Sequence, residues 1–185
     1  MSDQQSLRLI LAAAAFAADR HRTQLRKDVE KSPYINHPLE LARILVEEGG
    51  VADPEVLAAA LLHDTVEDTA TSLAEIENRF GPRVAGMVAE LTDDKALEKS
   101  ERKRMQVVNA PGKTQGAKLV KLADKISNLR DILDKPPAHW PADRKRDYFL
   151  WAADVVAGLR GVSPALEASF DDVHARGLQA FAQAA

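Results

Sequence analysis

Apolar residues recur every three or four positions along nearly the whole chain, and this spacing constrains the fold more than any other feature. Period-two alternation rich in β-branched residues, which is typical of half-buried strands, is scarce. Hydrophobic residues make up 45% of the 185 residues, enough to form one substantial core. We therefore predict an all-α protein with a single domain over residues 1–185, a bundle of about eight to ten helices.

Capping residues, glycines and prolines divide this pattern into separate helices. The first helix is expected from about Leu7 to Arg22, and Asn36 is expected to cap the second. The apolar face of the first helix is expected to hold Leu7, Ile10, Leu11, Ala14 and Ala18. Ser72 is followed by a glutamate three residues later, which predicts a capping box. The helices after the first are expected at residues 36–47, 54–64, 72–81, 82–91, 98–108, 116–133, 142–159 and 164–181.

Composition narrows the classes of protein and of site. The sequence has no cysteine, so any metal must be held by histidine, carboxylate or backbone oxygen. No signal peptide and no apolar run of about 20 residues is seen, so we expect a cytoplasmic protein without a membrane partner. The net charge of −3 argues against binding nucleic acid. A basic stretch over residues 95–130 still leaves room for a local anion site.

The strongest local signal is the segment His63-Asp64-Thr65-Val66-Glu67-Asp68, at the end of an apolar helix. One imidazole and three carboxylates lie within six positions, and a divalent ion would offset the repulsion between the carboxylates. The ordinary alternative is a solvated helix end beside a half-buried histidine.

Ingredients of the same site recur elsewhere in the chain. His37 begins one expected helix and Asp124 interrupts the apolar face of another. Together with His63 and Asp64 they form a nitrogen and oxygen ligand set suited to Mn²⁺, Fe²⁺ or Zn²⁺. Three polar residues share one helix face with Asp124, and a solvent-facing row of ion pairs is the alternative there; they are Lys121, Lys125 and Asn128.

The H…HD…D pattern of His37, His63-Asp64 and Asp124 resembles that of the HD superfamily. The segment HDTVEDT at 63–69 resembles the signature of RelA/SpoT-type (p)ppGpp hydrolase domains. Further similar segments are RKD at 26–28, PYINHP at 33–38, TDDK at 92–95 and KLVKLADKISNLRD at 118–131. The resemblance is greatest to the small stand-alone alarmone hydrolases, covers nearly the whole chain, and implies an HD-domain helical bundle.

This resemblance implies a cofactor, a reaction and a set of site residues. One Mn²⁺ would be bound by His37, His63, Asp64 and Asp124. Glu67 and Asp68 would be the catalytic pair that orients water and transfers protons during hydrolysis of (p)ppGpp to pyrophosphate and GDP or GTP. The expected substrate-binding residues, which include the two lysines and the asparagine named above, are Arg26, Lys27, Lys99, Arg104, Lys121, Lys125, Asn128, Arg144 and Tyr148.

Two other functions remain open at this point. An HD phosphatase could act on another nucleotide, such as NADPH by removal of its 2′-phosphate, and would release orthophosphate instead of pyrophosphate. A non-catalytic helical module could bind a guanine nucleotide or a protein and keep the metal as a structural element. The presence of both Glu67 and Asp68 favours an enzyme. The oligomeric state is undetermined.

Overall fold

The computed structural model describes residues 1–137 and 139–182 and confirms the all-α prediction. Across those residues it has ten α-helices, one 3-10 helix and no strand, only an isolated bridge between Leu25 and Pro33. The elements are α1 (Asp3–Arg20), α2 (Asn36–Glu47), α3 (Pro54–Leu62), α4 (Thr65–Asp68), α5 (Leu73–Phe80), α6 (Pro82–Leu91), α7 (Lys99–Asn109), η1 (Ala110–Gly112), α8 (Gln115–Asp134), α9 (Ala142–Ala157) and α10 (Pro164–Phe181).

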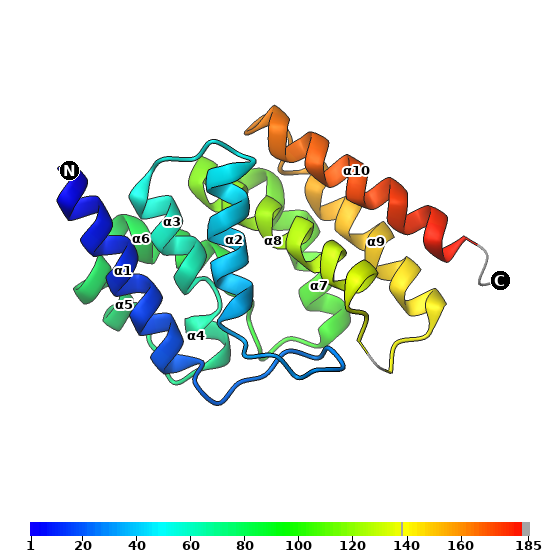
Figure 1. Cartoon of the computed structure of the whole chain (residues 1–185), viewed down its shortest axis with the longest axis horizontal. Helices are drawn as coiled ribbons and strands as arrows, with labels where there is room; N and C mark the ends of the chain where they lie inside the picture. The colour runs from blue at the N-terminus through cyan, green and yellow to red at the C-terminus, as the bar shows by residue number, and fades with distance from the viewer. Residues whose placement is uncertain (138, 183–185) are drawn as a thin grey trace.

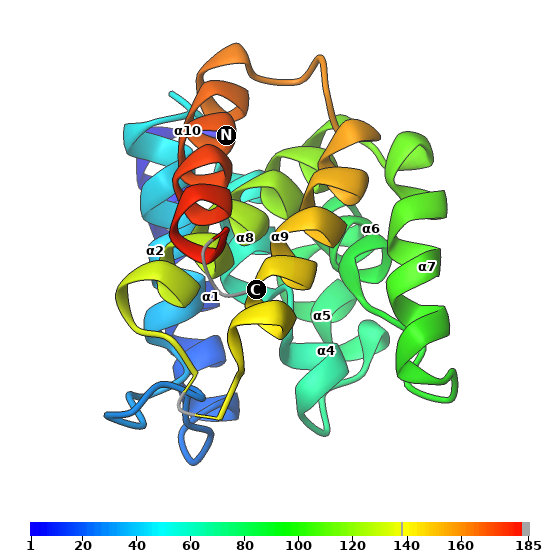
Figure 2. The ribbon, with the colours of Figure 1, turned by 90° about the vertical axis from the view of Figure 1, so that its right-hand side faces the viewer.

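Helix α8 runs through the middle of the molecule (Figure 1). It packs against α2, α3 and α6 on one side and against α9 and α10 on the other. Leu122, Ile126 and Leu129 are fully buried along it. Figure 2 shows α10 on one side of α9 and α7 on the other, and α10 contacts both α8 and α9. A helix surrounded on most sides can carry polar residues only where they face a cavity or one another. On α8 the buried charged residues are Lys121, Asp124 and Lys125.

Several helix starts follow from the side chains that precede them. The Asp53 carboxylate accepts the Glu55 N–H at 3.0 Å, with Pro54 in the first turn, as the sequence predicts. Ser72 Oγ accepts the Glu75 N–H at 3.2 Å, which is the first half of the predicted capping box. The prediction for Asn36 is wrong. Asn36 is the first residue of α2 itself, and no side chain caps that helix.

The face that α1 turns inward is only partly the predicted one: Ile10 and Ala14 pack against the core, but the two leucines do not. Leu7 and Leu11 are 61% and 68% exposed, whereas Ala13, Phe16 and Ala17 are buried. The cause is the partner helix: α1 packs closely on α3, and small residues allow that close approach better than leucines. The prediction relied on the large apolar residues of α1, and the sequence does not show that α1 packs against α3.

Two further boundaries differ from the sequence prediction. Helix α1 begins earlier than predicted, at Asp3, because Ser2 and Gln5 form a reciprocal capping box. Helix α3 ends at Leu62, and a separate short helix, α4, holds Glu67 and Asp68. None of the helices in the described part combines the length and the hydropathy that crossing a bilayer requires.

Candidate metal centre and active site

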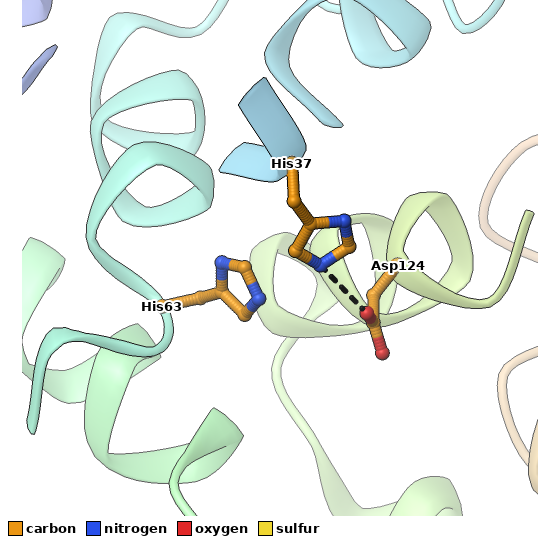
Figure 3. A group of neighbouring side chains, drawn as sticks. All are labelled: His37, His63 and Asp124. Carbon is orange, nitrogen blue, oxygen red and sulfur yellow. Dashed lines mark ion pairs between the residues drawn. The ribbon is translucent and has the colours of Figure 1, made fainter. Parts of the chain in front are cut away.

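Three side chains from distant parts of the chain meet in the interior. His37 comes from the first turn of α2, His63 from the residue after α3, and Asp124 from the middle of α8 (Figure 3). One ligand atom from each lies within 4.8 Å of the others, and all three residues are buried. The structure thus brings together three of the four residues that the sequence analysis proposed as metal ligands.

The His63 ring is oriented by the backbone. Its Nδ1 lies 2.9 Å from the carbonyl oxygen of Ala60, which can only accept, so Nδ1 carries the proton and, in the neutral imidazole, Nε2 carries the lone pair. Nε2 is buried and forms no hydrogen bond to any described residue. It lies 2.9 Å from Asp64 Oδ2, but without hydrogen-bonding geometry. A buried nitrogen lone pair beside a carboxylate is a site that a cation would satisfy.

The His37 ring is also oriented through Nδ1, the nitrogen that faces away from Asp124. Nδ1 lies 3.2 Å from the Ser127 hydroxyl and Nε2 lies 3.3 Å from Asp124 Oδ1. Burial lowers the pKa of His37, which favours the neutral imidazole that binds metals.

Asp64 borders this group. Its Oδ2, which lies beside His63 Nε2, also accepts a hydrogen bond from the Tyr34 hydroxyl. The fourth predicted ligand therefore lies beside His63 but outside the group of three whose ligand atoms are within 4.8 Å of one another.

Asp124 is surrounded by donors from its own helix. Asn128 Nδ2 donates to Asp124 Oδ1 at 2.5 Å, and the ammonium nitrogens of Lys125 and Lys121 lie 3.4 and 3.9 Å from Oδ2. Burial works to raise the pKa of Asp124, but attraction to Lys125, together with the influence of His37 and Lys121, outweighs burial and keeps this pKa far below its usual range. Lys121 and Lys125 are only 7% and 2% exposed, so the alternative of a solvent-facing row of ion pairs does not apply.

A cavity of about 520 Å³ opens above these residues, and we call it the central cavity. Its wall includes the predicted metal ligands His37, Asp64 and Asp124 and the predicted catalytic pair Glu67 and Asp68. The other residues of its wall are Arg26, Lys27, Tyr34, Asp93, Lys95, Arg102, Gln106, Lys121, Lys125, Asn128, Tyr148 and Trp151.

The two acids of the catalytic pair have different surroundings. Glu67 Oε2 accepts the backbone N–H of Asp93 at 3.1 Å, and burial raises the pKa of Glu67. Asp68 is held from two sides, since Lys95 Nζ donates to its Oδ1 at 2.7 Å and Gln24 Nε2 donates to its Oδ2 at 3.0 Å. Burial therefore makes Glu67 readier to take up a proton, and two donors hold Asp68 in position.

Two smaller spaces adjoin the central cavity. The first, about 310 Å³, is bounded by the loop after α1 and includes Arg26 and Lys27; we call it the loop lobe. The second, about 260 Å³, is walled by Trp140 and Trp151; we call it the tryptophan lobe. Tyr148 borders all three spaces. Four cations line the tryptophan lobe besides Lys27: Lys99, Arg102, Lys103 and Arg144.

The structure brings eight of the nine predicted substrate-binding residues to these spaces, and the exception is Arg104. The Arg104 guanidinium is exposed and pairs with Glu101 on the same helix, with a nitrogen to oxygen distance of 2.6 Å. Arg104 lines neither the central cavity nor its lobes. Successive residues of a helix point in different directions, so the basic residues of α7 cannot all face one space. Arg102 is the one that lines the central cavity.

Some residues of the site were not foreseen. Arg102, Gln106, Trp140 and Trp151 all line the cavity or its tryptophan lobe. Trp151 lies on α9 and Trp140 just before that helix begins. Tryptophan is mostly buried in packing, so the sequence offers no signal that either indole faces an open space. The helical spacing of Arg102 from Gln106 is the one local hint, since residues four apart share a face.

The donor set fits a divalent ion. It combines imidazole nitrogens with carboxylate oxygens and has no thiolate, and both imidazoles are oriented through their second nitrogen. The family model described as "HD domain" matches residues 13–152, which include all four predicted ligands.

The chain belongs to the HD-domain family.

Curated relatives of this HD domain carry the name guanosine-3′,5′-bis(diphosphate) 3′-pyrophosphohydrolase MESH1. The protein of Xenopus tropicalis is 58% identical over 163 residues, which cover 88% of this chain and 91% of the relative. The human protein is 58% identical over 158 residues, covering 85% and 88%. Both alignments cover most of each protein, so the chain is similar to these small hydrolases over most of its length.

A solved structure has nearly the same fold. It is described as a metazoan ortholog of SpoT that hydrolyses ppGpp, and it matches with a TM-score of 0.88 and 46% sequence identity over 91% of this chain and 94% of that one. A protein from Listeria monocytogenes matches with a TM-score of 0.66 and 31% identity over 82% of this chain and 97% of that one. The first of these two matches agrees with the RelA/SpoT-type resemblance.

Proposed function

We propose that this HD domain is a Mn²⁺-dependent 3′-pyrophosphohydrolase, which converts (p)ppGpp to pyrophosphate and GDP or GTP. The observation that carries the proposal is that Glu67 and Asp68 share the central cavity with His37 and Asp124, two members of the buried cluster that His63 completes. A metal held only for structure would not need two more acids facing the same space. The names of the 58% identical relatives support the choice of substrate.

His37, His63, Asp64 and Asp124 would hold the ion. A divalent ion bound there lowers the pKa of a water molecule and polarises a phosphoryl oxygen. The remaining steps belong to side chains of the protein. Glu67 takes a proton from the attacking water and passes it toward the leaving 3′-oxygen, a role for which its raised pKa suits it. Asp68, held by Gln24 and Lys95, orients that water.

The substrate would lie across the central cavity with its two ends in the lobes. Arg26, Lys27 and Asn128 border the loop lobe, which would take the nucleoside. Lys121 and Lys125 lie beside Asp124 and would neutralise the reacting diphosphate. The tryptophan lobe, with Lys99 and Arg144, would hold further phosphates, and Tyr148 lies where the three spaces meet.

A nucleotide panel tests this function. Purified protein loaded with Mn²⁺, Zn²⁺, Fe²⁺ or Mg²⁺ is incubated with ppGpp, pppGpp, NADPH and GTP, while pyrophosphate and orthophosphate are measured separately. We expect pyrophosphate from ppGpp and pppGpp, with the highest rate in Mn²⁺. Orthophosphate from NADPH with ppGpp left intact would replace this proposal by the NADPH phosphatase, and tight nucleotide binding without turnover in any metal would indicate a binding module.

Variants assign the roles within the same assay. Glu67→Gln keeps the shape of the side chain but cannot take a proton, so we expect kcat to fall by about 100-fold or more while Mn²⁺ still binds. Asp64→Ala should lose both Mn²⁺ affinity and activity. Glu77→Gln changes an exposed glutamate of α5 and serves as the matched control, with unchanged kcat. A Glu67→Gln variant with wild-type kcat would remove Glu67 from the mechanism.

A further inference from the structure

The amide of Gln24 links the predicted catalytic Asp68 to a buried histidine outside the cavity. Gln24 Nε2 donates to Asp68 Oδ2 at 3.0 Å, and Gln24 Oε1 lies 2.6 Å from His21 Nδ1. His21 is only 2% exposed and borders neither the central cavity nor its lobes. His21 therefore has no access to a substrate bound in these spaces, and any effect on the reaction must pass through Gln24.

The chemistry of the three groups fixes the direction of each hydrogen bond. A carboxylate only accepts, so the NH₂ end of the Gln24 amide must face Asp68. The oxygen end then faces His21, whose Nδ1 must donate. If that donor were absent, the amide could turn over, and its oxygen would then repel the Asp68 carboxylate.

The backbone around Gln24 is held independently of this side-chain link. The Gln24 N–H donates to the His21 carbonyl at 2.9 Å, and the Tyr34 N–H donates to the Gln24 carbonyl at 3.0 Å. The His21 ring also packs on the Tyr34 ring, with centroids 4.8 Å apart. A variant that keeps an aromatic ring at position 21 should therefore keep the loop and lose only control of the amide.

The second nitrogen of His21 shows that stability alone does not explain a histidine here. Nε2 is buried and has no hydrogen-bond partner among the described residues. A buried polar atom without a partner costs about 1–3 kcal/mol, whereas phenylalanine would pack against Tyr34 without that cost. The Nδ1–H is what histidine offers at this position and phenylalanine does not.

We propose that His21 is a positioning residue: its Nδ1–H fixes the Gln24 amide so that Gln24 Nε2 holds the Asp68 carboxylate at the central cavity. This inference rests on the proposed hydrolase function, in which Asp68 orients the attacking water. It adds to the site a residue that binds neither metal nor substrate.

The decisive variant is His21→Phe, which keeps the ring and removes the donor. We expect kcat for ppGpp to fall about 10-fold through misplacement of Asp68, while KM and Mn²⁺ affinity stay within about twofold. The melting temperature should not fall, because the unpaired nitrogen is removed as well. His21→Asn supplies an amide N–H near the position of Nδ1 and should recover most of the kcat.

A matched control and a double variant separate this role from packing. His174 of α10 is another histidine whose Nε2 is buried without a partner in the described residues, and it stacks on Phe170. His174→Phe should keep wild-type kcat. His21→Phe combined with Gln24→Ala should be no slower than Gln24→Ala alone, because both changes break the same link. A wild-type kcat for His21→Phe, or additive losses in the double variant, would overturn the proposal.

A measurement without substrate keeps the two proposals distinct. In the wild-type protein the Gln24 side-chain NH₂ should give two separate, slowly exchanging NMR signals, assigned by their absence in Gln24→Ala. In His21→Phe these signals should broaden or exchange faster. If the wild type releases no pyrophosphate, the function fails, but the NMR signals still decide whether His21 fixes the amide. Unchanged signals in His21→Phe would overturn the positioning role itself.

Discussion

The charged residues around Asp124 are stable in the interior only as a set. Lys125 is almost completely buried, its ammonium group lies 3.1 Å from Gln106 Oε1 and 4.2 Å from the centre of the Trp151 ring, and burial lowers its pKa to about 8. Removing one partner from such a group leaves the others buried without compensation, which costs more than the intact group contributes. We propose that binding of a ligand in the central cavity, and not stability, explains this arrangement.

Two individual arginines of α7 should differ sharply in their effect on substrate binding. Arg102 lines the central cavity, its Nε is buried without a partner among the described residues, and its guanidinium lies 4.0 Å from Glu67. Arg104 is exposed and already paired with Glu101. We expect Arg102→Ala to raise KM for ppGpp about 10-fold and Arg104→Ala to leave it within about twofold. Steady-state kinetics check this, and the reverse order would favour the original prediction for Arg104.

At the scale of helices, the site depends on where three elements meet. The end of α3, the start of α2 and the middle of α8 each contribute one member of the His37, His63 and Asp124 group. The Thr65 hydroxyl donates to the Leu62 carbonyl at 2.7 Å, where α3 ends and α4 begins. This break separates the buried His63 from Glu67 and Asp68, so that the acids face the cavity instead of continuing around the α3 helix.

Glu48 should make the packing of three helices sensitive to pH. It lies at the end of α2, pairs with Arg130 of α8 at 2.6 Å and accepts the Ser169 hydroxyl of α10 at 2.8 Å. The hydrogen bond from Arg130 lowers the pKa of Glu48 below its ordinary 4.5 in the folded protein. A group with a lowered folded pKa contributes stability above its unfolded pKa, and this contribution is lost as the pH falls through the folded value.

The corresponding variant is Glu48→Gln. We expect it to lower the free energy of unfolding by about 1 kcal/mol at pH 7, and this difference from the wild type should shrink as the pH falls below 4.5. Urea denaturation at several pH values measures it. Glu47→Gln, in the exposed pair with Arg43, is the control and should have little effect at any pH. A loss that stays constant down to acidic pH would contradict the role of the Glu48 charge.

At the scale of the whole molecule, the question is whether α10 folds and unfolds together with the rest of the chain. It lies beyond residues 13–152 that the HD-domain model matches, yet it packs on both α8 and α9. A Cβ added to Gly177 of α10 would lie 1.8 Å from the Phe149 ring of α9, so glycine is required for this close approach. We propose that residues 1–185 form one cooperative domain with α10 as an integral part.

Gly177→Ala tests this proposal. The overlap with Phe149 should destabilise the protein by about 2 kcal/mol, more than the gain of about 0.5–1 kcal/mol from replacing a helical glycine. Gly86→Ala on α6, where nothing lies within 4 Å of the added Cβ, should give only that gain. Melting is followed by far-ultraviolet circular dichroism and by the near-ultraviolet signal of Trp140 and Trp151. Both transitions should shift together; an early, separate loss of helix would show that α10 is a separate unit.

The sequence alone determined most of the helices and the candidate chemical groups. Helical periodicity and caps such as Asp53 act over a few residues, and the identity of His37, His63, Asp64, Glu67, Asp68 and Asp124 can be read without a fold. Only the tertiary structure decided that Leu7 and Leu11 of α1 face outward, that Arg102 faces the cavity in place of Arg104, and that His21 lies behind Asp68. These depend on which helices pack against one another, and contacts between residues far apart in the chain are set by that packing and not by local propensity.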